Sequence, residues 1–250
     1  MEIHGNNILI VGGTSGIGRE LAESFHDLGN KVIVAGRKLS LIDEIKLVRP
    51  DISGLELDLN HKDAVSHLSS SIENNFPDIN VLIANAGVMK SENLSDQNGD
   101  ISTAENIINT NILGVLRTVG AALPTLKKRK STIIVTTSSL AFIPRANFPS
   151  YCASKAFLHS WIQSLRYQLR DAGVDVLELA PPYVRTRLTG AHQSEDPRAM
   201  PLNDFIAEVI WKLANSDHEN GEIIVNRVRD DRDAESNGRY REAFEIINPS

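Results

Sequence analysis

Short apolar runs alternate with longer segments of helical periodicity along the whole chain. The short runs predict buried strands, at Ile8–Val11, Val32–Ala35, Leu55–Leu57, Val81–Ala84, Thr132–Val135, Val174–Leu179 and Glu222–Val225. Apolar residues that recur every three or four positions predict helices, at Ile17–Leu28, Leu41–Val48, Ala64–Phe76, Thr103–Leu126, Ser150–Leu169 and Pro201–Ala214. This alternation predicts an α/β protein with a doubly wound, Rossmann-type fold, in which helices cover both faces of a central parallel sheet of about seven strands.

No linker, repeat or low-complexity segment interrupts the series, so residues 1–250 are expected to form a single domain. Gly114 and Gly120 weaken the helix prediction locally within Thr103–Leu126. Two polar segments, Arg187–Met200 and Asp230–Gly238, are expected to be flexible. The first follows a strand end, where open α/β sheets bind ligands, and it fits a lid over a ligand and an ordinary surface loop equally well.

Composition excludes several classes of protein. The formal net charge of −6 argues against a nucleic-acid or anionic-membrane partner. The single cysteine, Cys152, cannot form an internal disulfide, so a reducing, cytoplasmic location is expected. The histidines are scattered without metal-ligand spacing, and no metal site is expected. The N-terminus does not read as a signal peptide, and no apolar stretch reaches the roughly 18 residues of a membrane span.

A glycine-rich segment, Val-Gly-Gly-Thr-Ser-Gly-Ile-Gly over residues 11–18, joins the first predicted strand to the first predicted helix. Glycines there permit a tight turn and let backbone N–H groups approach a pyrophosphate, and the helix N-terminus adds partial positive charge. Such loops also occur for tight packing alone, and the strand-before, helix-after context favours the phosphate function. The candidate cofactor residues are Gly12, Thr14, Ser15, Gly16, Ile17 and Gly18.

The end of the second predicted strand bears on which nicotinamide cofactor is bound. An acidic residue at this place binds a ribose 2′-hydroxyl and repels a 2′-phosphate. The chain carries Arg37 there, with no competing carboxylate, so NADP(H) is preferred over NAD(H), although a solvated arginine at a strand end is the alternative. Asp58, after the third strand, fits equally well as an acceptor for the adenine amino group and as an ordinary turn aspartate.

Tyr151 and Lys155 lie four residues apart at the start of a predicted helix, so they share one helix face. Free tyrosine has a pKa of about 10, too high for efficient acid–base catalysis at neutral pH. A lysine charge roughly 4 Å away is of the right size to lower that pKa by about three units, which burial would partly offset. A Tyr-x-x-x-Lys pair alone is a weak signal, because such pairs arise by chance in many helices.

Two further polar residues are candidates for the same chemistry. Ser138 lies just past the fifth predicted strand, where a hydroxyl can hydrogen-bond a substrate oxygen as charge develops on it. Thr137 and Ser139 compete for that role, and any of the three can simply cap the strand end. Asn111 lies inside a predicted helix, an unfavourable position for asparagine, and fits either a water-linked proton relay or an ordinary polar side chain.

Taken together, these motifs resemble the short-chain dehydrogenase/reductase family over nearly the whole chain, from Ile8 to about Val225. Residues 138–144 and 178–184 look like its DltE-like subgroup. The resemblance implies a cofactor half over about residues 1–130 and a catalytic and substrate half over about 131–250. It also implies an NADP(H)-dependent oxidoreductase that moves a hydride between the cofactor and a small carbonyl or alcohol substrate, in a homodimer or homotetramer paired through the helices carrying Asn111 and Tyr151.

The family's residue roles follow from the same resemblance. Tyr151 would donate or accept the substrate proton, Lys155 would bind the nicotinamide ribose and lower the Tyr151 pKa, and Ser138 would orient the carbonyl. Asn111 would support a water-linked relay. Val184 and Thr186 would hold the nicotinamide carboxamide. The other positions of the cofactor site are Arg37, Asp58, Leu59, Asn85, Ala86, Gly87 and Pro181.

The chain departs from the family pattern at Val11 for Thr, Ala84 for Asn and Pro182 for Gly, and none of these changes removes a catalytic group. A substrate pocket is expected from Phe142–Phe148, Tyr183 and Arg187–Met200, but the substrate is not readable. The main alternative is a non-catalytic NADP(H)-binding regulator on the same fold. An epimerase or dehydratase is a third reading, although little chain follows Pro181 to build a sugar-nucleotide domain.

Overall fold

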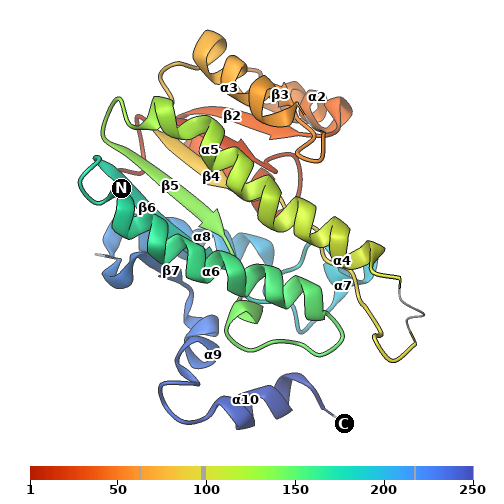
Figure 1. Cartoon of the computed structure of the whole chain (residues 1–250). Helices are drawn as coiled ribbons and strands as arrows, with labels where there is room; N and C mark the ends of the chain where they lie inside the picture. Colours follow the sequence, from red (N-terminus) through yellow and green to blue (C-terminus); the bar gives the residue numbers. More distant parts are fainter. Residues whose placement is uncertain (62, 97–99, 217, 250) are drawn as a thin grey trace.

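A computed structural model describes residues 1–61, 63–96, 100–216 and 218–249. Seven strands form one parallel sheet in the order β3-β2-β1-β4-β5-β6-β7 (Figure 1). Their bounds are β1 Asn7–Val11, β2 Lys31–Gly36, β3 Ser53–Glu56, β4 Val81–Ala84, β5 Ser131–Thr136, β6 Val174–Ala180 and β7 Glu222–Ile224. All seven strand predictions are confirmed to within two residues, as is the doubly wound parallel architecture.

The helices cover both faces of the sheet because side chains alternate along each strand. In β1, Leu9 and Val11 face a core shared with α3, α5 and α6, whereas Ile8 and Ile10 face a second core shared with α1, α2 and α8. All four side chains are at most 1% exposed. The helices are α1 Gly16–Asp27, α2 Leu39–Val48, α3 Ala64–Asn75, α4 Ser102–Ile107, α5 Gly114–Leu126, α6 Pro149–Leu169, α7 Ala191–Glu195, α8 Leu202–Asn215, α9 Arg229–Asp233 and α10 Tyr240–Ile247.

The long helix predicted over Thr103–Leu126 is interrupted by a π-helical turn, η1 (Ile108–Leu113), between α4 and α5. Asn111 lies in this turn, and Gly114 follows it. A Cβ on Gly114 would lie 3.1 Å from the Leu59 side chain, so glycine permits the close approach. Residues 102–126 have the length and mean hydropathy, 1.2, of a possible membrane span, but half of the window is buried in the protein, where α5 packs on the sheet.

The segments expected to be flexible contain regular structure. Arg187–Met200 includes α7 and returns to the sheet edge, where Val184 and Met200 form a parallel bridge. Asp230–Gly238 includes most of α9. Neither α7 nor α9 was predicted, and each has only five residues, too few to show a periodic pattern. The eight-residue α10 was also missed, although Tyr240, Phe244 and Ile247 have helical spacing. It lies beyond α9, away from the sheet (Figure 1).

Three short 3₁₀ turns complete the described structure, namely η2 (Ser139–Ala141), η3 (Glu219–Gly221) and η4 (Asn226–Val228). The strand order changes direction between β1 and β4. The helix that follows β1 packs on one face of the sheet, and α5, which follows β4, packs on the other face. At such a switch point the carboxyl ends of parallel strands leave a crevice. The functional residues predicted from the sequence follow these strand ends.

Candidate active site

A cavity of about 690 Å³ lies at the carboxyl ends of the strands. Its walls come from the β1–α1 loop, from the residues after β2 to β6, and from the first turns of α6. Most of the predicted site residues line it, namely Gly12, Thr14, Ser15, Gly16, Ile17, Arg37, Asp58, Leu59, Asn85, Ala86, Gly87, Ser138, Tyr151, Lys155, Pro181, Val184 and Thr186. The fold therefore brings together residues that lie up to 174 positions apart in the chain (186 − 12 = 174).

The β1–α1 loop has the geometry of a phosphate cradle. Gly12 and Gly16 have positive φ angles, +81° and +52°. A Cβ on Gly12 would lie 2.6 Å from the backbone of Ala86, and one on Gly18 would lie 2.1 Å from the Gly12 carbonyl oxygen. The Ser15 side chain makes no capping hydrogen bond to α1, so it does not compete for the helix's first N–H groups. The loop thus offers backbone donors and a helix N-terminus to an anion.

Arg37 and Asp58 lie at the β2 and β3 end of the cavity, and both are exposed. Asp58 accepts a hydrogen bond from the Asn60 backbone N–H at 3.0 Å, which is the contact of an ordinary turn aspartate. Asp58 also lines the cavity, so its contact with adenine stays a prediction beside the turn contact. Gly36, just before Arg37, packs so closely on Thr14 that a Cβ would lie 2.6 Å from the threonine hydroxyl oxygen.

Two predicted site residues, Gly18 and Asn111, do not line the cavity in the part of the chain that the structure describes. Gly18 lies behind the loop, where it lets α1 pack against Gly12. Asn111 is fully buried, and its side chain connects two segments of the chain through hydrogen bonds. Its amide donates to the Val88 carbonyl at 2.9 Å and to the Ser154 hydroxyl at 3.1 Å, and its oxygen accepts from the Val88 N–H at 2.8 Å.

Ser138, Tyr151 and Lys155 share one wall of the cavity, and each is less than 8% exposed. The Ser138 hydroxyl oxygen accepts a hydrogen bond from the Leu140 N–H at 3.2 Å. The Lys155 ammonium donates to the Thr136 carbonyl at 2.9 Å and lies 5.7 Å from the centroid of the Tyr151 ring. Ser138, which follows β5, and the i, i+4 pair of α6 therefore line the same cavity.

The expected lowering of the Tyr151 pKa by Lys155 is not found in this structure. Burial raises the pKa of Tyr151 to about 12, the Ser138 hydrogen bond opposes this shift, and the Cys152 charge adds to it. Burial lowers the pKa of Lys155 to about 8, with the Glu178 charge opposing. The expected direction was wrong because desolvation of the buried phenol is the largest cause of the shift.

Gln193, in α7, is a cavity residue that the sequence analysis missed. Its side chain is 4% exposed, and its amide nitrogen donates to the Val184 carbonyl at 2.8 Å and to the Thr186 hydroxyl at 3.1 Å. Its oxygen accepts from the Thr189 N–H and hydroxyl at 2.9 and 2.8 Å. Nothing in the local sequence marks this glutamine, because its partners belong to a loop that only the fold closes over it.

The expected substrate wall is only partly correct. Arg187, Leu188, Gln193 and Ser194 of the predicted lid line the cavity, but Phe142–Phe148 and Tyr183 do not. The Phe142 ring instead packs edge-on against His159 with centroids 5.1 Å apart, and the Tyr183 hydroxyl donates to Asp196 at 3.3 Å. Glu92 was also missed. Its carboxylate accepts from the Ser150 N–H and hydroxyl at 3.1 and 2.9 Å, at the α6 N-terminus just before Tyr151.

Fold and site together define a dinucleotide-binding α/β protein with a serine, a tyrosine and a lysine in one wall of its cavity. The sequence matches the short chain dehydrogenase family over residues 6–197. The chain belongs to this family.

Among similar proteins, the uncharacterized oxidoreductase DltE of Bacillus subtilis is 34% identical over 99% of this chain and 98% of its own length. A Staphylococcus aureus oxidoreductase is 30% identical over 88% of this chain and 96% of its own length.

Solved structures share the fold. A short chain dehydrogenase from Burkholderia cenocepacia in complex with NADP superposes with a TM-score of 0.82 at 22% identity, covering 98% of both chains. A 3-ketoacyl-(acyl-carrier-protein) reductase from Brucella melitensis complexed with NADH gives a TM-score of 0.76 at 22% identity, covering 88% of this chain and 96% of the other. The chain is therefore a short-chain dehydrogenase/reductase oxidoreductase with a Rossmann-like fold.

Proposed function

We propose that this oxidoreductase transfers a hydride between NADP(H) and a carbonyl or alcohol substrate, with Tyr151 as the general acid and base. The observation that carries the proposal is the position of Ser138, Tyr151 and Lys155 in the wall of the same cavity as the phosphate cradle. A protein that only bound the dinucleotide would have no need of a buried phenol beside a buried ammonium.

The preference for NADP(H) over NAD(H) is supported by the charges around the cavity. The described lining residues include one acidic side chain, Asp58, against five basic ones, at Arg37, Lys90, Lys155, Arg185 and Arg187. Such a lining suits a cofactor that carries three phosphate groups. Arg37 is exposed where the ribose 2′-phosphate would lie in this family, and no carboxylate follows β2 to repel it.

The chain's own residues supply the acid–base half of the reaction. When bound, the reduced nicotinamide supplies the hydride. Tyr151, with its pKa raised by burial, stays protonated at neutral pH and donates its proton to the carbonyl oxygen. The Ser138 oxygen accepts from Leu140, and the Ser138 proton, which bonds Tyr151, would turn to the same carbonyl oxygen when the substrate binds. The Lys155 charge, 5.7 Å from the ring, favours the phenolate that forms.

The cofactor contacts at the nicotinamide end would come from Lys155, Val184 and Thr186. The hydrogen bond from Gln193 to Thr186 supports this assignment. The Gln193 amide donates to the Thr186 hydroxyl oxygen, so the hydroxyl proton can be donated to a ligand. Asn111 would hold Val88 and Ser154 in place through its hydrogen bonds. We also propose that Asn111 supports a water-linked proton relay, which a structure with bound substrate would test.

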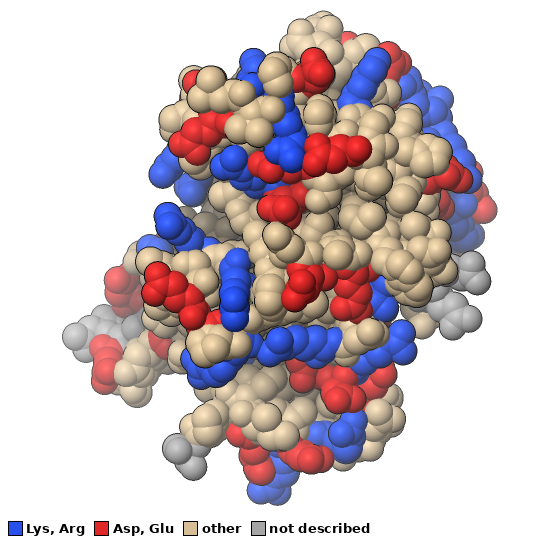
Figure 2. Space-filling view, turned by 180° about the vertical axis from the view of Figure 1, so that it is seen from behind, with Lys and Arg blue, Asp and Glu red and all other residues tan. Residues whose placement is uncertain are grey.

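A homodimer or homotetramer in the cytoplasm completes the proposal. Apolar side chains are exposed on the helices expected to pair, with Ile108 45%, Phe157 43% and Tyr167 69% exposed. Pairing of subunits would cover such side chains. On the face shown in Figure 2, acidic and basic side chains are interspersed without a uniformly basic region, which agrees with small-molecule substrates and no nucleic-acid partner.

The test is NADPH consumption by purified protein against a panel of aldehydes and ketones, with NADH in parallel. Tyr151→Phe is expected to lower kcat at least about 100-fold while NADPH binding is retained, since only the proton donor is removed. Tyr240→Phe makes the same change on an exposed position of α10, outside the cavity, and is expected to leave turnover unchanged.

Substantial turnover by Tyr151→Phe would refute the assigned role. Tight NADPH binding without turnover of any substrate would favour the alternative, a non-catalytic regulator that keeps the cradle.

A further inference from the structure

Glu178 is a charged residue in the interior of an otherwise apolar strand. It lies in β6 between Leu177 and Leu179, is 1% exposed, and pairs in register with Val135 of β5. Like Val135, it faces α6, because His159 of that helix contacts it. A carboxylate this deeply buried is strongly unfavourable unless hydrogen bonds and an opposite charge compensate it.

Two side chains hold the carboxylate. The Thr137 hydroxyl donates to one oxygen at 2.6 Å, and His159 Nδ1 lies 2.7 Å from the other. The Gln163 side-chain amide lies 2.9 Å from His159 Nε2, so both ring nitrogens have a partner. The Glu178 charge also acts to raise the pKa of three nearby cations, Lys155, Arg166 and Arg232.

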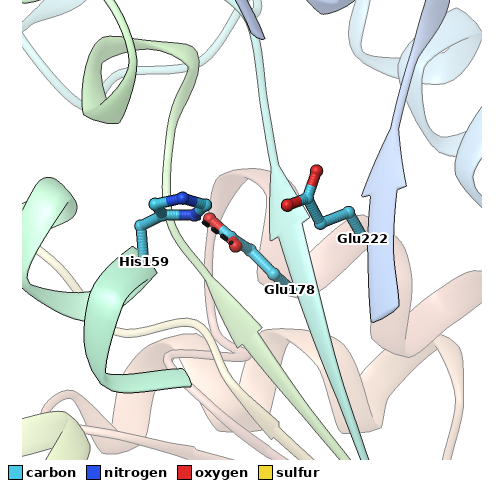
Figure 3. Close-up of side chains that lie close together, drawn as sticks. All are labelled: His159, Glu178 and Glu222. Atoms are coloured by element: carbon cyan, nitrogen blue, oxygen red, sulfur yellow. Dashed lines mark hydrogen bonds and ion pairs between the residues drawn. The ribbon is translucent and has the colours of Figure 1, made fainter. Parts of the chain in front are cut away.

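A second carboxylate, Glu222 of β7, faces the same point from the far side. Figure 3 shows His159, Glu178 and Glu222 converging between α6, β6 and β7, with one ligand atom of each within 4.8 Å of the others. This spacing would suit a metal ion, but Arg232 of α9 binds both Glu222 oxygens, at 2.8 and 2.9 Å. Each carboxylate oxygen of the group already faces a proton donor, so the arrangement is a hydrogen-bonded charge cluster.

Lys155 is the cation on the catalytic side of this cluster. It lies four residues before His159, on the same face of α6, and its ammonium bonds the Thr136 carbonyl, next to the Thr137 that bonds Glu178. The other two cations nearby have hydrogen-bond partners elsewhere. Arg232 pairs with Glu222, and Arg166 donates to the carbonyls of Val176 and Gly221. The Glu178 charge raises the pKa of Lys155, against the larger lowering caused by burial.

We infer that Glu178 is a positioning residue of the active site, whose buried negative charge keeps the Lys155 side chain protonated. The inference rests on the role proposed for Lys155. His159 and the Thr137 hydroxyl hold the carboxylate in the strand interior, and Arg232 pairs with the neighbouring Glu222. Glu178 does not line the cavity, so its effect on the chemistry there would pass through the Lys155 ammonium.

The test is the titration of Lys155 in Glu178→Gln, followed by NMR of ¹³C-labelled lysine side chains and assigned with a Lys155→Arg sample. The variant keeps the shape, and its amide can still bond Thr137 and His159, so the fold is expected to survive. At an effective dielectric of about 20, removal of one nearby unit charge is expected to shift the midpoint by about 1 to 2 pH units. The Lys155 midpoint and the alkaline limb of the kcat profile are both expected to move down by this amount.

Glu222→Gln is the matched control, since it removes the other carboxylate of the cluster, and its Lys155 midpoint is expected to stay within about 0.3 pH units. An unchanged Lys155 midpoint in Glu178→Gln would overturn the inference. So would equal shifts in both variants, or a loss of melting temperature without any shift. If no substrate is turned over, the proposed function fails, while the NMR midpoint still decides the role of Glu178.

Discussion

Replacing Gln193 by Glu tests whether α7 belongs to the cofactor site. The two side chains have the same shape, but the carboxylate has no amide hydrogens. The hydrogen bonds donated to the Val184 carbonyl and the Thr186 hydroxyl oxygen, at 2.8 and 3.1 Å, are lost. The bonds accepted from Thr189 remain possible. The substitution therefore changes the side of Gln193 that faces the nicotinamide end of the cavity.

The expected magnitude follows from the burial of Gln193, which is 4% exposed. A buried hydrogen bond lost in this way costs about 1 to 1.5 kcal/mol, so two cost about 2 to 3 kcal/mol. The Thr186 hydroxyl can rotate to donate to the new carboxylate, which recovers part of this energy but removes the proton available to a ligand. The cost of the two lost bonds is expected in the free energy of unfolding. Dinucleotide affinity is expected to fall by the one ligand contact that Thr186 loses, about 1 to 1.5 kcal/mol, which at about 1.4 kcal/mol per tenfold is about 5- to 10-fold.

Fluorescence titration of NADPH and of NADH distinguishes a loss of contacts at the nicotinamide end from a loss at the adenosine end of the cofactor. Both dissociation constants are expected to rise by the same factor, because the altered contacts follow β6, whereas Arg37, the residue proposed to read the 2′-phosphate, follows β2. Glu195→Gln is the control, since this exposed residue of the same helix does not line the cavity. Unchanged affinity for both cofactors, or a loss confined to NADPH, would refute the role given to Gln193.

Two further predictions concern single charges in the cavity. Arg37→Ala is expected to weaken NADPH at least about tenfold and NADH less than about twofold in the same titration, because only NADPH carries the 2′-phosphate, and equal losses would mean that Arg37 does not read it. Lys155→Met is expected to be more stable than the wild type at pH 7. Because the pKa of Lys155 is about 8 in the folded protein and 10.5 in an unperturbed lysine, the unfolded chain holds the extra proton between these limits. The wild-type free energy of unfolding should therefore rise by up to about 3 kcal/mol from pH 8 to 10.5, and this rise should be absent in Lys155→Met. Urea unfolding at pH 7 and pH 10 gives the free energy of unfolding of both proteins. If this energy changes with pH equally in the two proteins, the lowered pKa of Lys155 is refuted.

Local patterns were sufficient for the fold. Ile8–Val11 is apolar at every position because β1 is buried on both faces, and the glycines that follow it are required by positive φ angles and by close backbone approach. The i, i+4 spacing of Tyr151 and Lys155 needed only the geometry of one helix. Their meeting with Ser138 followed from the parallel sheet, because successive strand ends share one edge.

The chain sequence could not reveal properties that depend on several distant segments at once. The direction of the Tyr151 pKa shift depends on how completely the phenol is buried, and the contact of His159 with Glu178 depends on the packing of α6 against β6. The π-helical turn places Asn111 between Val88 and Ser154, which no local propensity predicts. Periodicity and spacing determined the elements and the candidate reacting groups, because those depend on neighbours in the chain. Burial and partner choice determined their charge states, because desolvation and long-range hydrogen bonds exist only once the chain is packed.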